Sequence, residues 1–259
     1  MNDTKPNLRF NEQPLDTNME GIYLLQFREQ GWTVLPQVFE ADSVDEYRRQ
    51  IEDAIRPGSQ PWNPFELPDD SPLYVYPARA PRLRSFVTRC LASAALPGYP
   101  VLRNTGWIIR RAAPGQNQAH DWHKDGDHEG VSCANGYAAP NFLHTITYLE
   151  DMTPEHGPTW VVPRSHRDGR LSPFVDDFKE TAFLPNKTDV VVWDPRLWHR
   201  AGTRTAAGYR TAAIFNFFGV PVNHGPLTPS PAQRQALAAA QDPVEQVLFG
   251  GAFALAQET

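Results

Sequence analysis

The first third of the chain alternates between helical and extended patterns of hydrophobic residues. A short helix is expected over residues 20–29, and the apolar run at residues 32–35 predicts a strand. Ser43, with Glu46 three residues later, forms a capping-box pattern that predicts the start of a second helix, over residues 44–56. The apolar residues of this helix recur at helical spacing: Val44, Tyr47, Ile51 and Ile55.

The pattern changes from helical to extended in the middle of the chain. Residues 57–80 are rich in Pro, Asp and Ser and predict an irregular loop, and residues 81–95 predict a third helix. Beyond residue 101, short apolar runs separated by turn residues predict a series of strands. The expected strands are residues 105–111, 142–149, 160–162, 190–193 and 210–218. This regular spacing is typical of a β-sandwich or jelly roll.

The two ends of the chain differ in character. The first 18 residues are polar and aperiodic, which predicts a loose arm. The C-terminal stretch, residues 227–259, predicts two short helices, because Ser230-Pro231 and Asp242-Pro243 each place a capping residue before proline. The sequence contains no evident internal repeat or linker. We therefore expect residues 1–259 to form a single domain, mainly β with flanking helices.

Composition and charge narrow the class of partner. Apolar residues make up 41% of the chain, and the formal net charge is −6 without a Lys/Arg run. We therefore expect no nucleic-acid or membrane partner, and a small organic molecule is the default ligand. The two cysteines form no CxxC pair and the N-terminal sequence lacks an apolar signal region, which predicts a cytoplasmic protein. The oligomeric state is not determined by the sequence.

One segment carries candidate metal chemistry. In an extended strand, residues two apart point to the same face, so His123 and Asp125 are expected to project together. An imidazole and a carboxylate are two of the three ligands in the facial triad that holds non-haem Fe(II). His199, which follows an apolar strand, is the best candidate for the third. Arg210 comes eleven residues after His199, and its planar guanidinium suits a carboxylate.

Each of these residues also has a plain structural interpretation. A His-x-Asp pair on a surface strand is usually accidental, His199 alone could be a core histidine, and Arg210 alone could belong to an ion pair. A zinc hydrolase is a weaker alternative, because no general base accompanies the three residues. The order of His-x-Asp, apolar strand, His and then Arg within one β-rich region favours the iron site.

Four segments carry a resemblance to a known family. They are FREQGWTVLPQVFEADSVDEYRRQIEDAI, PGQNQAHDWHKD, TYLEDMTPEHGPTWVVPRSHRDG and TDVVVWDPRLWHRAGTRTAAGYRTAAIFNF. In their order and spacing they resemble the phytanoyl-CoA dioxygenase family of Fe(II)- and 2-oxoglutarate-dependent oxygenases, over roughly residues 24–222. The resemblance implies a double-stranded β-helix, which is a cupin-like jelly roll. It also implies Fe(II) as cofactor, with 2-oxoglutarate and O2 as cosubstrates.

The resemblance also implies roles for individual residues. His123, Asp125 and His199 would hold the iron, and Arg210 would bind the distal carboxylate of 2-oxoglutarate. Further cosubstrate contacts are expected from neighbouring strands, by Trp107, Arg111, His120, Thr145 or Thr147. The substrate pocket is expected to be lined by Trp122, Tyr137, Phe142, Trp198 and Phe215. His166 is expected to brace a turn by hydrogen bonding and not to bind metal.

The reaction implied is hydroxylation of an unactivated C–H bond in a small metabolite, with succinate and CO2 as co-products. Desaturation, epoxidation or ring rearrangement by the same iron core, in a specialised pathway for natural products, is the alternative. A non-catalytic, cupin-like metal-binding protein is a further alternative. Arg210 argues against it, because a bare metal site needs no residue that binds a carboxylate.

Overall fold

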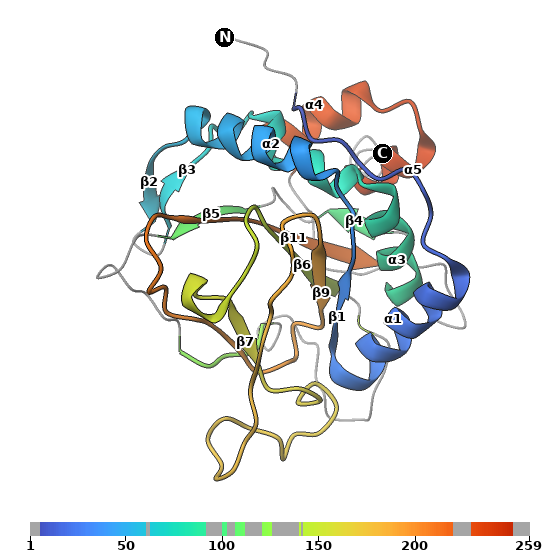
Figure 1. The fold of residues 1–259 in the computed structure, drawn as a ribbon. Helices are drawn as coiled ribbons and strands as arrows, with labels where there is room; N and C mark the ends of the chain where they lie inside the picture. The colour runs from blue at the N-terminus through green and yellow to red at the C-terminus, as the bar shows by residue number, and fades with distance from the viewer. Residues whose placement is uncertain are drawn as a thin grey trace.

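A six-stranded antiparallel sheet forms the centre of the protein, and helices pack along one side of it (Figure 1). The computed structural model describes residues 6–60, 63–91, 100–102, 107–111, 121–125, 140, 142–219 and 229–250. The sheet runs in the order β1 (Trp32–Leu35), β9 (Val190–Trp193), β6 (Phe142–Tyr148) and β11 (Arg210–Gly219). The far edge of β11 pairs with both β5 (Trp107–Arg111) and β4 (Pro100–Leu102).

A second, smaller sheet has three strands, in the order β10 (His199–Ala201), β7 (Thr159–Val161) and β8 (Thr181–Ala182). A separate hairpin pairs β2 (Arg56–Gln60) with β3 (Asn63–Glu66). Short 3-10 turns connect some of these elements: η1 (Pro72–Tyr74), η2 (Tyr76–Arg79) and η4 (Pro154–His156). The chain passes from the large sheet to the small one between β9 and β10, and the candidate metal ligand His199 begins β10.

Five α-helices flank the sheets: α1 (Thr17–Gln30), α2 (Ala41–Ala54), α3 (Pro81–Leu91), α4 (Pro231–Ala239) and α5 (Pro243–Leu248). The expected C-terminal caps are confirmed, because the side chains of Ser230 and Asp242 accept hydrogen bonds from the first turns of α4 and α5. Among the described helices, none combines the length and apolar character that a bilayer crossing requires.

The strand alternation divides the large sheet into two faces with separate cores. Phe215 and Phe217 of β11 belong to the larger core, which also contains residues of α2 and α3. Ala212 and Ile214 of the same strand belong with the smaller core, together with Trp193 of β9. We call these the helix face and the inner face of the sheet. Because successive side chains on a strand point to opposite faces, one residue's shift in register exchanges the two.

Two expectations about the N-terminal half are wrong. Residues 6–16 are not a loose arm, since Leu8 is buried in the larger core and Phe10 forms a backbone bridge with Phe39. Ser43 is not a cap: α2 begins after Glu40, and the Ser43 hydroxyl donates to the carbonyl of Glu40 from within the helix. Leu8 and Phe10 belong to no periodic apolar pattern in the sequence, so their contacts are seen only in the tertiary structure.

Several short strands and turns also differ from those expected from the sequence. The expected irregular loop at residues 57–80 contains most of the β2–β3 hairpin and the turns η1 and η2. The strands β4, β8 and β10 have two or three residues each and were not expected. Such short runs show no hydrophobic pattern of their own, and they become strands only by pairing with a neighbour.

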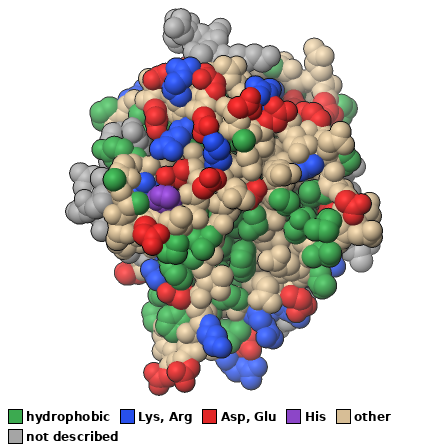
Figure 2. Space-filling view, in the orientation of Figure 1, with side chains coloured by type: hydrophobic (Ala, Val, Ile, Leu, Met, Phe, Trp, Pro, Cys, Tyr) green, Lys and Arg blue, Asp and Glu red, His purple; other side chains and the backbone are tan. Residues whose placement is uncertain are grey.

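Acidic and basic side chains intermingle over the upper part of the face in Figure 2, where Figure 1 places α2. On α2 these charges pair along the helix, Arg48 with Glu52 and Arg49 with Glu46 and Asp53. Hydrophobic side chains lie on the middle and right of the same view. The exposed apolar residues of α1, on that side, are Met19, Ile22 and Leu25.

Gly31 connects the helical layer to the sheet at a very crowded point. It ends α1 with a φ of 84°, in the left-handed region that favours glycine. A Cβ at this position would lie 2.6 Å from Nδ1 of His166 and 2.7 Å from Cδ2 of Leu197. The Gly31 carbonyl also accepts a hydrogen bond from the backbone of Asp194. Only glycine fits here without displacing the segment that leads to His199.

We predict that Gly31→Ala lowers the free energy of unfolding by roughly 2–4 kcal/mol, because it adds both backbone strain and steric overlap. Gly21→Ala is the matched control, since a Cβ there meets nothing within 4 Å and lies inside α1. The control should be neutral or stabilise the protein by up to about 1 kcal/mol. Urea unfolding of the two variants measures both effects, and equal stabilities would show that the crowding at Gly31 is unimportant.

Candidate metal centre

The structure brings His123, Asp125 and His199 together. One potential ligand atom from each lies within 4.8 Å of the other two. Nε2 of His199 is 3.3 Å from Oδ2 of Asp125, and Nε2 of His123 is 3.8 Å from Oδ1. The side chain of His199 is buried, whereas those of His123 and Asp125 are 43% exposed. The cluster is therefore anchored on one side and accessible on the other, as a catalytic metal site requires.

Backbone hydrogen bonds join the two segments that supply the ligands. His123 and His199 form an antiparallel bridge in which each N–H donates to the other's carbonyl, at 3.0 and 2.9 Å. Nδ1 of His123 lies 2.8 Å from the carbonyl of Asp121, and Nδ1 of His199 lies 2.9 Å from that of Leu197. Because a carbonyl accepts only from an N–H, both rings carry a proton on Nδ1 and leave Nε2 able to bind a metal.

The backbone of Asp125 is hydrogen-bonded to a buried turn between β9 and β10. The N–H of Asp125 donates to the carbonyl of Pro195, at 2.9 Å. The turn that presents this carbonyl is held by Asp194, which is fully buried and accepts hydrogen bonds from the backbone N–H and guanidinium of Arg196. A buried carboxylate with several donors is satisfied in place, so the turn has little freedom to move. The position of Asp125 is therefore set by both ends of the β9–β10 connection.

A third imidazole contacts the carboxylate of Asp125. Nε2 of His144, on the inner face of β6, lies 3.0 Å from Oδ2 of Asp125. Burial raises the pKa of Asp125, but the close imidazoles of His144 and His199 outweigh that effect and hold the pKa below its ordinary value. Asp125 is therefore an anion at neutral pH, as a metal ligand must be.

Arg210 is a buried cation without a described partner for most of its guanidinium. It begins β11 and is 5% exposed, and its Nε and Nη1 have no hydrogen-bond partner among the described residues. Burial lowers its pKa. The nearby acid Glu150 is instead paired with Arg204, at 3.1 Å. Because an unpaired buried charge is costly, this arrangement fits an anionic ligand that supplies the missing acceptors.

Arg210 lies on the same side of the sheet as the metal cluster. Alternate residues of a strand share a face, so Arg210, Ala212, Ile214 and Asn216 all belong to the inner face of β11. Asn216 is paired in register with His144, which contacts Asp125. The inner face between these two points is apolar, with Ile146, Trp193, Ala212 and Ile214.

The expected cosubstrate contacts from β6 are wrong by one residue in register. Thr145 and Thr147 pair with Phe215 and Ala213, which belong to the larger core on the helix face. The hydroxyl of Thr145 donates to the carbonyl of Phe215 and is fully buried there. These two threonines, and Phe215 as an expected pocket residue, therefore face away from the metal cluster. His144, between Leu143 and Thr145, occupies the inner face instead.

Two expected pocket residues also face the wrong way. Trp122 and Trp198 directly precede His123 and His199, and alternation turns them to the opposite side. Trp122 packs edge-on against Phe178 and under the guanidinium of Arg200. Trp198 contacts Phe174 and the ammonium of Lys124. These contacts lie on the side of the chain that faces away from the metal cluster, so the two tryptophans pack behind His123 and His199.

Other expected contacts are not tested by the structure. His120 and Tyr137 lie outside the described residues. For Trp107, Arg111 and Phe142 the structure describes the backbone alone, in which Arg111 pairs with Arg210 and Trp107 with Ile214. His166 is outside the metal cluster, as expected, and its Nε2 lies 3.2 Å from the carbonyl of Arg28. The expectation that it braces a turn is confirmed.

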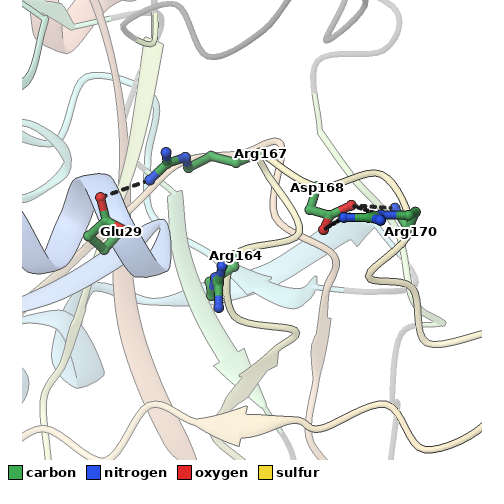
Figure 3. Close-up of a pocket in the computed structure, with 5 residues that line it drawn as sticks. All are labelled: Glu29, Arg164, Arg167, Asp168 and Arg170. Atoms are coloured by element: carbon green, nitrogen blue, oxygen red, sulfur yellow. Dashed lines mark hydrogen bonds and ion pairs between the residues drawn. The ribbon is translucent and has the colours of Figure 1, made fainter.

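A charged cavity of about 320 Å³ lies elsewhere, between the end of α1 and the loop after β7 (Figure 3). Two acid–base pairs line it, Arg167 with Glu29 and Arg170 with Asp168, each at 2.9 Å, and Arg164 lies between them. Most of its charge is paired internally, and it shares no residue with the metal cluster. It is not the candidate active site.

Two residues beside the metal cluster, His144 and Asn216, are not among the site residues predicted from the sequence. Both are polar residues within otherwise apolar strands, in FLHTITY and RTAAIFNFFG. This is the signal that could have found them, because a polar residue in a buried strand requires a partner. It would not have identified the partner, since the pairing of β6 with β11 joins residues 72 positions apart.

Comparisons with known proteins agree with this geometry. The sequence profile of phytanoyl-CoA dioxygenase (PhyH) matches residues 27–212. No sequence among the curated proteins matches this chain significantly. Among solved structures, the α-ketoglutarate-dependent epimerase SnoN from nogalamycin biosynthesis aligns at 16% identity and a TM-score of 0.61, over 79% of this chain and 84% of its own.

Two further structures share the fold. HygX from Streptomyces hygroscopicus, with nickel, 2-oxoglutarate and hygromycin B bound, has 20% identity and a TM-score of 0.61, over 78% of this chain and 88% of its own. The carbocyclase SnoK from nogalamycin biosynthesis has 21% identity and a TM-score of 0.52, over 81% and 89%. With the profile matching most of its length, the chain belongs to the phytanoyl-CoA dioxygenase (PhyH) family.

Proposed function

We propose that this 2-oxoglutarate-dependent oxygenase uses Fe(II), 2-oxoglutarate and O2 to hydroxylate an unactivated C–H bond of a small organic metabolite. The observation that carries the proposal is one pairing of features on the inner face of the sheet. A His-Asp-His cluster lies there together with the buried Arg210, whose Nε and Nη1 have no hydrogen-bond partner among the described residues. The cluster fits a divalent metal and the arginine fits a carboxylate, and together they match a metal with a dicarboxylate cosubstrate.

Each residue has a defined part in this proposal. Nε2 of His123, Nε2 of His199 and the carboxylate of Asp125 would hold Fe(II), and the guanidinium of Arg210 would orient the distal carboxylate of 2-oxoglutarate. When bound, iron with 2-oxoglutarate and O2 supplies the oxidant for the C–H bond, and succinate and CO2 are released. The apolar inner face, with Ile146, Trp193 and Ile214, would exclude water from the cosubstrate.

The fold supports the same proposal. The six-stranded and three-stranded antiparallel sheets would close as the two walls of a double-stranded β-helix, with the β9–β10 connection as one of the links between them. The 43% exposure of His123 and Asp125 would let a substrate approach the metal from the open side. A cupin-like protein that only stores metal would have no use for the buried Arg210.

A second outcome of the same iron core is favoured by the structural neighbours. Two of them are described as an epimerase and a carbocyclase, and both belong to nogalamycin biosynthesis. This supports desaturation, epoxidation or ring rearrangement in a natural-product pathway as the alternative to hydroxylation. The two outcomes share every protein ligand, so the position of the substrate decides between them. Mass analysis of the product separates desaturation, which loses two hydrogens, from hydroxylation and epoxidation, which each add one oxygen, and NMR of the product separates the last two.

Metal binding provides the first test. Anaerobic addition of Fe(II) and 2-oxoglutarate to the metal-free protein should produce a weak visible charge-transfer band. Asp125→Ala and His199→Ala should each abolish it, because two remaining ligands hold the metal too weakly. His156→Gln is the matched control, since His156 lies in the 3-10 turn η4 outside the metal cluster, and it should retain the band. A band that survives in both ligand variants would show that the iron binds elsewhere.

Cosubstrate binding provides the second test. Arg210→Gln should weaken 2-oxoglutarate binding to the metal-loaded protein by roughly 100-fold, because a buried carboxylate would lose a charge-assisted pair of hydrogen bonds. Metal affinity in the absence of 2-oxoglutarate should be unchanged. Arg170→Gln is the control, since the Arg170 side chain is 90% exposed and pairs only with Asp168 among described residues. Calorimetric titration gives both affinities, and equal 2-oxoglutarate affinity in the two variants would refute the role of Arg210.

A further inference from the structure

His144 is held at both ends of its ring beside the metal cluster. Its Nε2 lies 3.0 Å from Oδ2 of Asp125, and its Nδ1 is hydrogen-bonded to Oδ1 of the Asn216 side chain. His144 and Asn216 are directly paired in the register of β6 and β11. The ring also packs against Trp193, with centroids 5.1 Å apart, and His144 is 7% exposed. A buried imidazole fixed by two strands and an indole has essentially one orientation.

This orientation is directed at the carboxylate and not at the metal position. The three residues whose potential ligand atoms lie within 4.8 Å of one another are His123, Asp125 and His199, and His144 is not among them. A carboxylate can only accept a hydrogen bond, so a neutral His144 that donates to Asp125 carries its proton on Nε2. The Asn216 amide is then turned so that its NH2 group, and not Oδ1, meets Nδ1.

We propose that His144 is a positioning residue that holds one oxygen of the Asp125 carboxylate, and that Asn216 orients it for this task. The inference rests on the proposed function, because it assigns Asp125 as a metal ligand. A carboxylate can coordinate a metal through one or both oxygens. A hydrogen bond that occupies one oxygen favours coordination through the other alone, which keeps a metal position open for cosubstrate or O2. Such outer contacts typically change metal affinity 10- to 100-fold.

Two substitutions at His144 separate hydrogen bonding from packing. His144→Leu fills the inner face without a donor, whereas His144→Gln retains an N–H that can reach the carboxylate. Thr145→Val is the matched control, because this neighbour on β6 faces the helical layer. Thermal unfolding of each variant shows whether it is folded, and Co(II) serves as the probe, since its binding is visible in the absorption spectrum and does not require catalysis.

The expected result is a 10- to 100-fold rise in the Co(II) dissociation constant for His144→Leu, with substantial recovery in His144→Gln and no change in Thr145→Val. Asn216→Leu should weaken binding less than His144→Leu. The double variant should be no weaker than His144→Leu alone, since Asn216 acts through His144. Equal Co(II) affinity in the folded His144→Leu variant and the wild type would overturn the proposal, as would full additivity in the double variant.

A second readout distinguishes a positioning residue from a ligand. In the Co(II) form, the N–H proton of each coordinated imidazole gives a strongly shifted, exchangeable NMR signal. We expect two such signals, from His123 and His199, in both wild type and His144→Gln. A third signal that disappears in His144→Gln would overturn the proposal by making His144 a ligand. If the wild type itself bound no Co(II), the metal site would fail, which is a different result from unchanged affinity in His144→Leu.

Discussion

Two backbone hydrogen bonds between His123 and His199 hold together the segments on which the candidate metal centre depends. The first segment is short, and its described residues, 121–125, contain no regular strand. It is held in place by this bridge and by the bond from Asp125 to the carbonyl of Pro195. These contacts are made by the backbone, so they position His123, Asp125 and His199 without using the side-chain atoms that would bind a metal.

Charge on the inner face is only partly paired among the described residues. Asp125 is an anion that contacts the imidazoles of His144 and His199, while Arg210 is a buried cation whose neighbour Glu150 is engaged by Arg204. Charges interact strongly in apolar surroundings, where water does not screen them. The inner face is therefore suited to bind a metal cation next to Asp125 and a carboxylate next to Arg210. The same arrangement would be costly in a protein that bound neither.

In each segment that carries a candidate ligand, neighbouring side chains point to opposite sides. His123 and His199 face inward, and their neighbours Trp122 and Trp198 face outward into aromatic and cationic contacts. These outer contacts form a rigid backing for the small sheet. Function on one face and support on the other thus come from a single property of extended chains, the alternation of side chains.

From the sequence alone, the clustering of His123, Asp125 and His199 and most of the longer strands and helices could be predicted. These depend on local spacing and on long apolar patterns. The contact of His144 with Asp125, its pairing with Asn216 and the outward direction of Trp122 and Trp198 could not. Each depends on which strands pair and in which register, and a shift of one residue exchanges the faces. Register is decided by contacts between residues far apart in the chain, which a local pattern does not contain.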